Sequence, residues 1–190
     1  HRCQVDSALA AKLWEEIENQ YQAQIRYYHN LHHLAMLFQV LTPVKVQVSD
    51  WDSLLWALFY HDFIYDVQQK DNEARSADFA QLVLSKLTYP KARIDRCVQH
   101  ILATKGHNIA EDPDTNFFVD ADLSILGQPL ATYENYTKQI GLEYQIFPDE
   151  LYLPGRQKVV QHFLAMDRIF KTEFFFEQYE KQARENLEWE

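Results

Sequence analysis

One segment, residues 51–65, is apolar on almost every side when it is read as a helix, and this feature most restricts the fold. Its uninterrupted apolar run, residues 54–60, is far shorter than the roughly 20 residues that a membrane span needs. Ser49 or Asp50 stands before the segment as a helix N-cap. A helix that is hydrophobic all round belongs in the interior of a protein. We therefore expect residues 51–65 to form the central helix of a bundle that has no membrane partner.

Apolar residues recur at helical spacing along most of the remaining chain. The expected helices begin near Asp6, Asn30, Asp71 and Pro90 and, later in the chain, cover residues 119–126, 129–141, 157–170 and 172–188. Residues 105–117 are the clearest loop, and Pro154 and Gly155 fall in an expected connection. Only 4 Gly and 6 Pro occur in 190 residues, too few for the tight turns of an all-β domain. These patterns predict one all-α domain, residues 1–190, of roughly eight to ten helices.

The chain is acidic, with 28 Asp and Glu residues against 18 Lys and Arg residues and a net charge of -10. Such a charge repels nucleic acids and anionic membranes, so neither is expected as a partner. The two cysteines, Cys3 and Cys97, are too few for a disulfide framework and form no C-x-x-C motif. A reducing compartment, the cytoplasm, is therefore the expected localisation.

The adjacent pair His61-Asp62 directly follows the apolar run of the central helix. A carboxylate buried there costs several kcal/mol, on the order of the penalty for burying an ion, unless something neutralises its charge. A metal ion would do so, and its remaining ligands would come from neighbouring helices. The alternatives are a buried His-Asp hydrogen bond without a metal, or an Asp62 side chain on the exposed edge of the helix.

The order of three polar motifs along the chain resembles the HD superfamily of metal-dependent phosphohydrolases. The motifs are RYYHNLHHL at residues 26–34, FYHDFIYD at residues 59–66 and DADLSILG at residues 120–127. With NEARSA at residues 72–77, Arg156 and residues 180–187, they are similar to a subfamily described only as predicted metal-dependent phosphohydrolases. The resemblance runs from Arg26 to the end of the chain. It implies an HD-type helical domain, with a metal-binding core over about residues 26–126 and C-terminal helices, about residues 129–190, packed on that core.

Carried over residue by residue, the resemblance implies four metal ligands: His33, His61, Asp62 and Asp122. His29 shares a helix face with His33 and is the alternative first ligand. Asp120 is the alternative last ligand, although it could instead cap a helix. Two imidazoles and two carboxylates without a thiolate suit one divalent ion, which could be Mn, Fe, Ni, Co, Mg or Zn.

The activity implied by the resemblance is hydrolysis of a phosphate ester or anhydride by water that the metal activates. The expected substrate is a small anionic metabolite, and nucleotides are the family's habit. Asp66, one helical turn after Asp62, and Glu73 are the candidate catalytic acid or base residues. An acidic residue that some family members carry three positions after the aspartate is Tyr65 here, which leaves the general acid open. The candidate substrate-binding residues are Arg26, His29, Lys105, His107 and Arg156.

A different class of function stays open beside the enzyme. An HD-like domain without catalytic activity could bind a nucleotide or a partner protein and use the metal structurally. Association of the chain with copies of itself is a further possibility that the sequence does not exclude.

Overall fold

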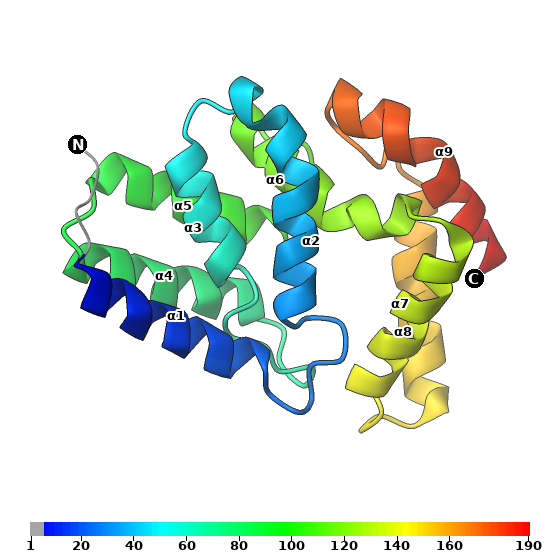
Figure 1. Cartoon of the computed structure of the whole chain (residues 1–190). Helices are drawn as coiled ribbons and strands as arrows, with labels where there is room; N and C mark the ends of the chain where they lie inside the picture. The colour runs from blue at the N-terminus through cyan, green and yellow to red at the C-terminus, as the bar shows by residue number, and fades with distance from the viewer. Residues whose placement is uncertain (1–5) are drawn as a thin grey trace.

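A computed structural model describes residues 6–190 of the chain, and within this range it contains helices and connecting turns but no β-strand (Figure 1). The all-α prediction is therefore confirmed. The α-helices are α1 (Ser7–Tyr21), α2 (Leu31–Leu41), α3 (Trp51–Tyr60), α4 (Asn72–Lys86), α5 (Lys91–Ala103), α6 (Pro113–Leu123), α7 (Leu130–Glu143), α8 (Asp149–Leu164) and α9 (Glu173–Trp189). Two 3-10 helices, η1 (Thr42–Gln47) and η2 (Ser124–Gly127), follow α2 and α6. Cys97 is free and buried, whereas Cys3 lies outside the described residues.

Helix α3 lies at the centre of the bundle, as its apolar sequence predicts. It contacts α2, α4, α5 and α6, and its side chains Leu54, Ala57 and Leu58 are at most 1% exposed. Its N-cap is Asp50, which accepts a hydrogen bond from the backbone N–H of Ser53. Among residues 6–190, no helix has the length and apolar character that a membrane crossing requires.

Helix α3 ends at Tyr60, five residues earlier than the apolar pattern predicts. Beyond it, the backbone makes hydrogen bonds with side chains from elsewhere in the chain. The Arg26 guanidinium donates to the carbonyl oxygens of Asp62 and Phe63, and the Ile64 N–H donates to the Ser76 hydroxyl. These partners replace the helical ones, so the segment that carries Asp62 is a turn rather than a helix. Asp66 is therefore not one helical turn after Asp62, which corrects the sequence-based expectation.

Two further boundaries differ from the predictions. Helix α6 begins at Pro113, inside the predicted loop, because Asp112 caps it and Pro113 suits a first helical position. Pro154 and Gly155 lie inside α8 rather than in a connection. Both residues are exposed, where water can satisfy the carbonyl that proline leaves without a partner.

The C-terminal helices α7, α8 and α9 stand together beside α2 and α6 (Figure 1). Asp120 fixes the start of α9, because its carboxylate accepts hydrogen bonds from the N–H groups of Lys171 and Thr172 and from the Thr172 hydroxyl. At the other end of α9, the Asn186 amide donates to the carbonyls of Leu126 and Gln128. The turn after α6 is thereby tied to the last helix of the chain.

Gly127 is expected to be needed for the contact between η2 and α9. A Cβ atom at this position would lie 2.5 Å from Cβ of Tyr179 and 2.6 Å from its carbonyl oxygen. We expect Gly127→Ala to lower the free energy of unfolding by about 1–3 kcal/mol, because the backbone must move apart. Gly155→Ala is the matched control, since nothing lies within 4 Å of its added Cβ. Urea unfolding should show this control unchanged or stabilised by about 0.5–1 kcal/mol; equal loss in both variants would contradict the packing argument.

Stability is also expected to depend on the protonation of His100, which is fully buried between α5 and α6. Its Nδ1 lies 2.8 Å from the Thr115 hydroxyl, and burial lowers the pKa of His100 to about 4. The unfolded chain, with an ordinary histidine pKa near 6.5, binds this proton first as the pH falls. The neutral, buried His100 therefore contributes fully to the free energy of unfolding above about pH 6.5. This contribution disappears as the pH falls toward 4, a loss of about 3 kcal/mol. Urea unfolding of the wild type and of His100→Gln between pH 7 and 4 should show this loss only in the wild type; parallel curves would be the opposite result.

Candidate metal centre

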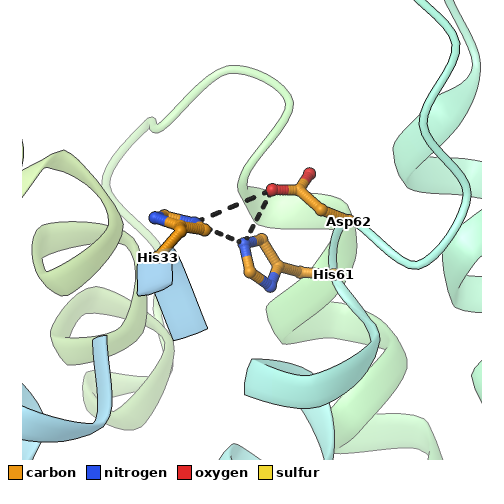
Figure 2. Close-up of side chains that lie close together, drawn as sticks. All are labelled: His33, His61 and Asp62. Carbon is orange, nitrogen blue, oxygen red and sulfur yellow. Dashed lines mark hydrogen bonds and ion pairs between the residues drawn. The ribbon is translucent and has the colours of Figure 1, made fainter. Parts of the chain in front are cut away.

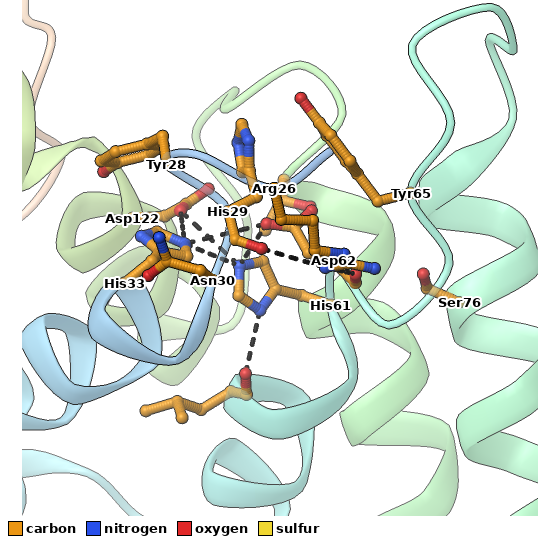
Figure 3. Close-up of polar contacts among 12 residues, drawn as sticks. Arg26, Tyr28, His29, Asn30, His33, His61, Asp62, Tyr65, Ser76 and Asp122 are labelled. Carbon is orange, nitrogen blue, oxygen red and sulfur yellow. Dashed lines mark hydrogen bonds and ion pairs between the residues drawn. The ribbon is translucent and has the colours of Figure 1, made fainter. Parts of the chain in front are cut away.

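Four side chains from three separate stretches of the sequence meet where α2, α3 and α6 come together (Figure 3). His33 lies in the first turn of α2, and the Asn30 side chain caps that helix by accepting from the His32 N–H. His61 is the C-cap of α3, and Asp62 follows in the turn. Asp122 lies in the last turn of α6. The apolar interior of the bundle thus brings helix ends, not helix middles, to one point.

Three of these residues form the tightest group (Figure 2). The ligand atoms of His33, His61 and Asp62 all lie within 4.8 Å of one another. His61 Nε2 is 3.1 Å from His33 Nε2 and 3.0 Å from Asp62 Oδ2, and His33 Nε2 is 3.7 Å from Asp62 Oδ2. Both histidines are buried and Asp62 is partly buried. These three residues therefore form a possible metal-binding triad.

Asp122 lies at the edge of this triad. Its Oδ1 is 3.4 Å from His33 Nε2 and 3.8 Å from His61 Nε2, whereas its Oδ2 is 2.9 Å from His107 Nε2. Asp120, the alternative ligand, is fully buried and bonded to the start of α9. The geometry therefore brings Asp122 to the triad and turns Asp120 away from it.

These distances fit a single small divalent cation. Donor atoms about 2.1 Å from an ion lie about 3.0 Å apart when adjacent in an octahedron and about 4.2 Å apart when opposite. Three pairs within the triad, at 3.0 to 3.7 Å, and the two pairs from Asp122 Oδ1 to the histidines, at 3.4 and 3.8 Å, fall within that span. Asp122 lies outside the group whose ligand atoms are all within 4.8 Å of one another, so its carboxylate must shift toward Asp62 to share an ion with the triad. His61 also has the support that metal ligands usually need, because its Nδ1 lies 2.9 Å from the Leu58 carbonyl oxygen and leaves Nε2 for an ion.

The electrostatics of the group show strong coupling of opposite charges. Burial opposes charge on His61, but the carboxylates of Asp62 and Asp122 raise its pKa to about 9. Burial likewise opposes ionisation of Asp62, but the His61 and His29 imidazoles hold its pKa below the ordinary value. Burial lowers the pKa of His33. A proton thus supplies part of the positive charge that a metal ion would bring to the two carboxylates.

A cavity of about 810 Å³, the large cavity, opens beside the group. Asp62 and Asp122 line it, so the metal group lies in its wall. Aromatic side chains contribute much of the remaining surface, and four cationic side chains also line it: Lys70, Lys105, Arg156 and Lys158. An acidic protein therefore has a cavity whose lining combines four cationic side chains with the carboxylates of the metal group.

Four of the five predicted substrate-binding residues line the large cavity: His29, Lys105, His107 and Arg156. Lys105 Nζ donates to the Lys70 carbonyl, and Arg156 is held by Glu190 through contacts of 2.6 and 2.8 Å. Arg26 is not part of the lining. It is only 7% exposed and donates to the carbonyls of His29, Asp62 and Phe63. It therefore holds the backbone segments that carry His29 and Asp62 in place.

The two predicted catalytic carboxylates are separated. Glu73, in the first turn of α4, lines the large cavity. Asp66 does not line it, because its carboxylate accepts a hydrogen bond from the Gln68 N–H and its backbone pairs with the Asn72 side chain. The early end of α3 explains this difference, since Asp66 lies in the turn beyond it.

Glu143 is an important site residue that the sequence analysis missed. Its carboxylate is completely buried at the end of α7 and accepts from the N–H groups of Tyr28 and His29. It also lies 2.7 Å from His29 Nδ1 and accepts from the Tyr65 hydroxyl at 2.6 Å. Burial opposes ionisation, but the bond from His29 lowers the pKa of Glu143 overall. No local pattern marks this glutamate, because its partners lie about 115 and 78 residues earlier in the chain.

Comparisons of the chain with models of protein families, with curated proteins and with solved structures gave no match, so the interpretation of this site rests on its geometry and chemistry.

Proposed function

We propose that the chain is a metal-dependent phosphohydrolase with an HD-type helical domain, acting on a small anionic metabolite. One observation carries this proposal. His33, His61, Asp62 and Asp122 converge from three helices at the wall of the large cavity. The donor set and the order of these residues agree with the metal-site pattern of the HD superfamily, and the spacing of the His33, His61 and Asp62 donor atoms fits one divalent ion.

The chemistry expected at this site is displacement at phosphorus by water. A divalent ion held there would lower the pKa of a water molecule and neutralise charge on a phosphoryl group. Residues of the chain orient the ligands: His107 Nε2 bonds to Oδ2 of Asp122, and the Leu58 carbonyl bonds to Nδ1 of His61. Glu73 is the predicted catalytic carboxylate that lines the large cavity. We assign it the role of general acid or base, which takes a proton from the attacking water or gives one to the leaving group.

The size and lining of the large cavity favour an organic phosphate over inorganic polyphosphate. A volume of about 810 Å³ is in the range of sites for drug-sized ligands. Tyr28 and Tyr136 pack edge to face in its wall, with ring centroids 4.6 Å apart, and Tyr144 and Tyr152 also line it. These rings suit a planar aromatic group, and Lys70, Lys105 and Lys158 suit its phosphates. A nucleotide is therefore the proposed substrate.

The test is phosphate release from a panel of nucleotides and phosphomonoesters with added Mn²⁺, Co²⁺, Ni²⁺ or Mg²⁺. We expect turnover of at least one substrate that depends on the metal and is lost in Asp62→Ala. Glu73→Gln should bind the metal normally and lose most of this turnover, by about 10²–10⁴-fold. Normal metal binding with no turnover of any substrate would instead favour the alternative, an HD-like binding module with a structural metal.

A further inference from the structure

A second cavity, the small cavity, lies on the other side of the metal group. Its volume is about 200 Å³, and its lining comes from the turn before α2, from α2, the end of α6, η2 and α7. His33 lines the small cavity and not the large one, whereas Asp122, Tyr28 and Tyr136 line both. The edge-to-face pair of Tyr28 and Tyr136 therefore stands between the two spaces.

The two ring nitrogens of His33 face different parts of the structure. Nε2 faces the metal group, and the other ring nitrogen points away from His61 and Asp62 (Figure 2). Within residues 6–190, this Nδ1 makes no hydrogen bond, and it is not one of the fully enclosed unpartnered atoms, so it is accessible from the small cavity although the His33 side chain is only 3% exposed. Histidines that bind metals almost always donate their second N–H to a carbonyl, a carboxylate or water, as His61 does to Leu58. When Nε2 binds a metal, the acceptor for His33 Nδ1 therefore comes from a molecule in the small cavity.

A second buried polar group faces the same space. Ser124 is 6% exposed and lines the small cavity, and its hydroxyl has no hydrogen-bond partner within the described residues. Thr132, Asn135 and Gln139 add further hydroxyl and amide groups from α7. Apart from Asp122, the lining contains no carboxylate, and it contains no Lys or Arg. This lining matches a neutral ligand that both donates and accepts hydrogen bonds.

The volume exceeds what a bridging water requires. One water needs roughly 10–15 Å³ of such volume, less than a tenth of the small cavity. We propose that the small cavity is a binding site for a small neutral polyol of about the size of a pentose, one hydroxyl of which accepts a hydrogen bond from His33 Nδ1. Ser124 and the side chains of α7 bind its other hydroxyls. This site is separate from the proposed phosphate site and requires no hydrolysis.

D-ribose is the probe, titrated into the full chain and followed by calorimetry and by ¹⁵N NMR of the histidine rings. We expect saturable binding with a shift of the His33 Nδ1 signal. Ser124→Ala should weaken binding roughly three- to tenfold through the lost hydrogen bond. Because the readout is ribose binding, its failure is distinct from a failure of the hydrolase assay.

Two tryptophan variants of α7 provide a matched pair. Asn135 and Lys138 are both exposed, but only Asn135 lines the small cavity. Asn135→Trp should therefore abolish ribose binding, and Lys138→Trp should leave it unchanged. Inorganic phosphate should not displace ribose, because the small cavity has no Lys or Arg and includes the Asp122 carboxylate. No saturable binding to the wild type, equal binding to both tryptophan variants, or competition by phosphate would each overturn the proposal.

Discussion

Replacing either His61 or Asp62 with alanine is expected to lower divalent-metal affinity by more than about 100-fold. Each side chain supplies a donor atom to the tightest group in the site, and His61 Nε2 lies within 3.1 Å of both other donors. Removing one donor leaves the other ligands with an incomplete coordination shell. Metal content after dialysis, measured by mass spectrometry, and calorimetric titration with Mn²⁺ both report this change.

Two further variants separate loss of a ligand from loss of the fold. Asp62→Asn keeps the size of the side chain and should also lose metal, although less completely, while its circular dichroism matches the wild type. His32→Ala is the matched control, because His32 is next to His33 but exposed. It should retain full occupancy. If His61→Ala and Asp62→Ala both kept the metal content of the wild type, the proposed metal centre would be wrong.

Arg26→Met is expected to be among the most destabilising substitutions, with a loss of about 3–5 kcal/mol in the free energy of unfolding. The Arg26 guanidinium bonds to the carbonyls of Asp62 and Phe63 at 2.7 and 2.9 Å and lies over the ring of Tyr21. Methionine fills a similar space but leaves these carbonyls without a donor. Because one of them belongs to Asp62, metal affinity should also fall by about tenfold or more.

Arg75→Met is the control for the loss in free energy of unfolding that Arg26→Met causes. The Arg75 side chain is 49% exposed, and its ion pair with Asp71 spans 4.0 Å on the surface of α4. Its loss should cost less than about 1 kcal/mol in urea unfolding. Arg26→Lys keeps the charge but not the planar fork, so it should recover only part of the stability. If Arg26→Met were no less stable than Arg75→Met, the role given to Arg26 would be wrong.

The fold class and the importance of the pair His61-Asp62 could be predicted because the signals for them are local. The apolar run of α3 places it at the centre of the bundle, and Asp6, Asn30 and Asp50 each cap a helix as their sequence positions predict. The pair His61-Asp62 stood out because polar residues follow a run that must be buried. His33 and Asp122 were found through a resemblance in the order of motifs, and the structure places them beside that pair.

The remaining features depend on contacts between distant segments, which a single sequence does not reveal. The end of α3 at Tyr60 depends on Arg26 and Ser76, and neither changes the local apolar pattern. The prediction that Asp66 belongs to the site requires a helix that continues beyond Tyr60, and α3 ends there. Glu143 looks like an ordinary charge at the end of a helix until the fold places His29 and Tyr65 against it. Such partners become visible only in three dimensions.

The most direct measurement of the central claim is X-ray absorption spectroscopy of the Co²⁺-loaded chain, combined with the metal-to-protein ratio. We expect one ion per chain, with two imidazole nitrogens and two carboxylate oxygens at about 2.1 Å. One imidazole contribution should disappear in His33→Ala and one in His61→Ala. A chain that binds no ion, or an ion whose imidazole coordination is the same in both variants and in the wild type, would contradict the central claim.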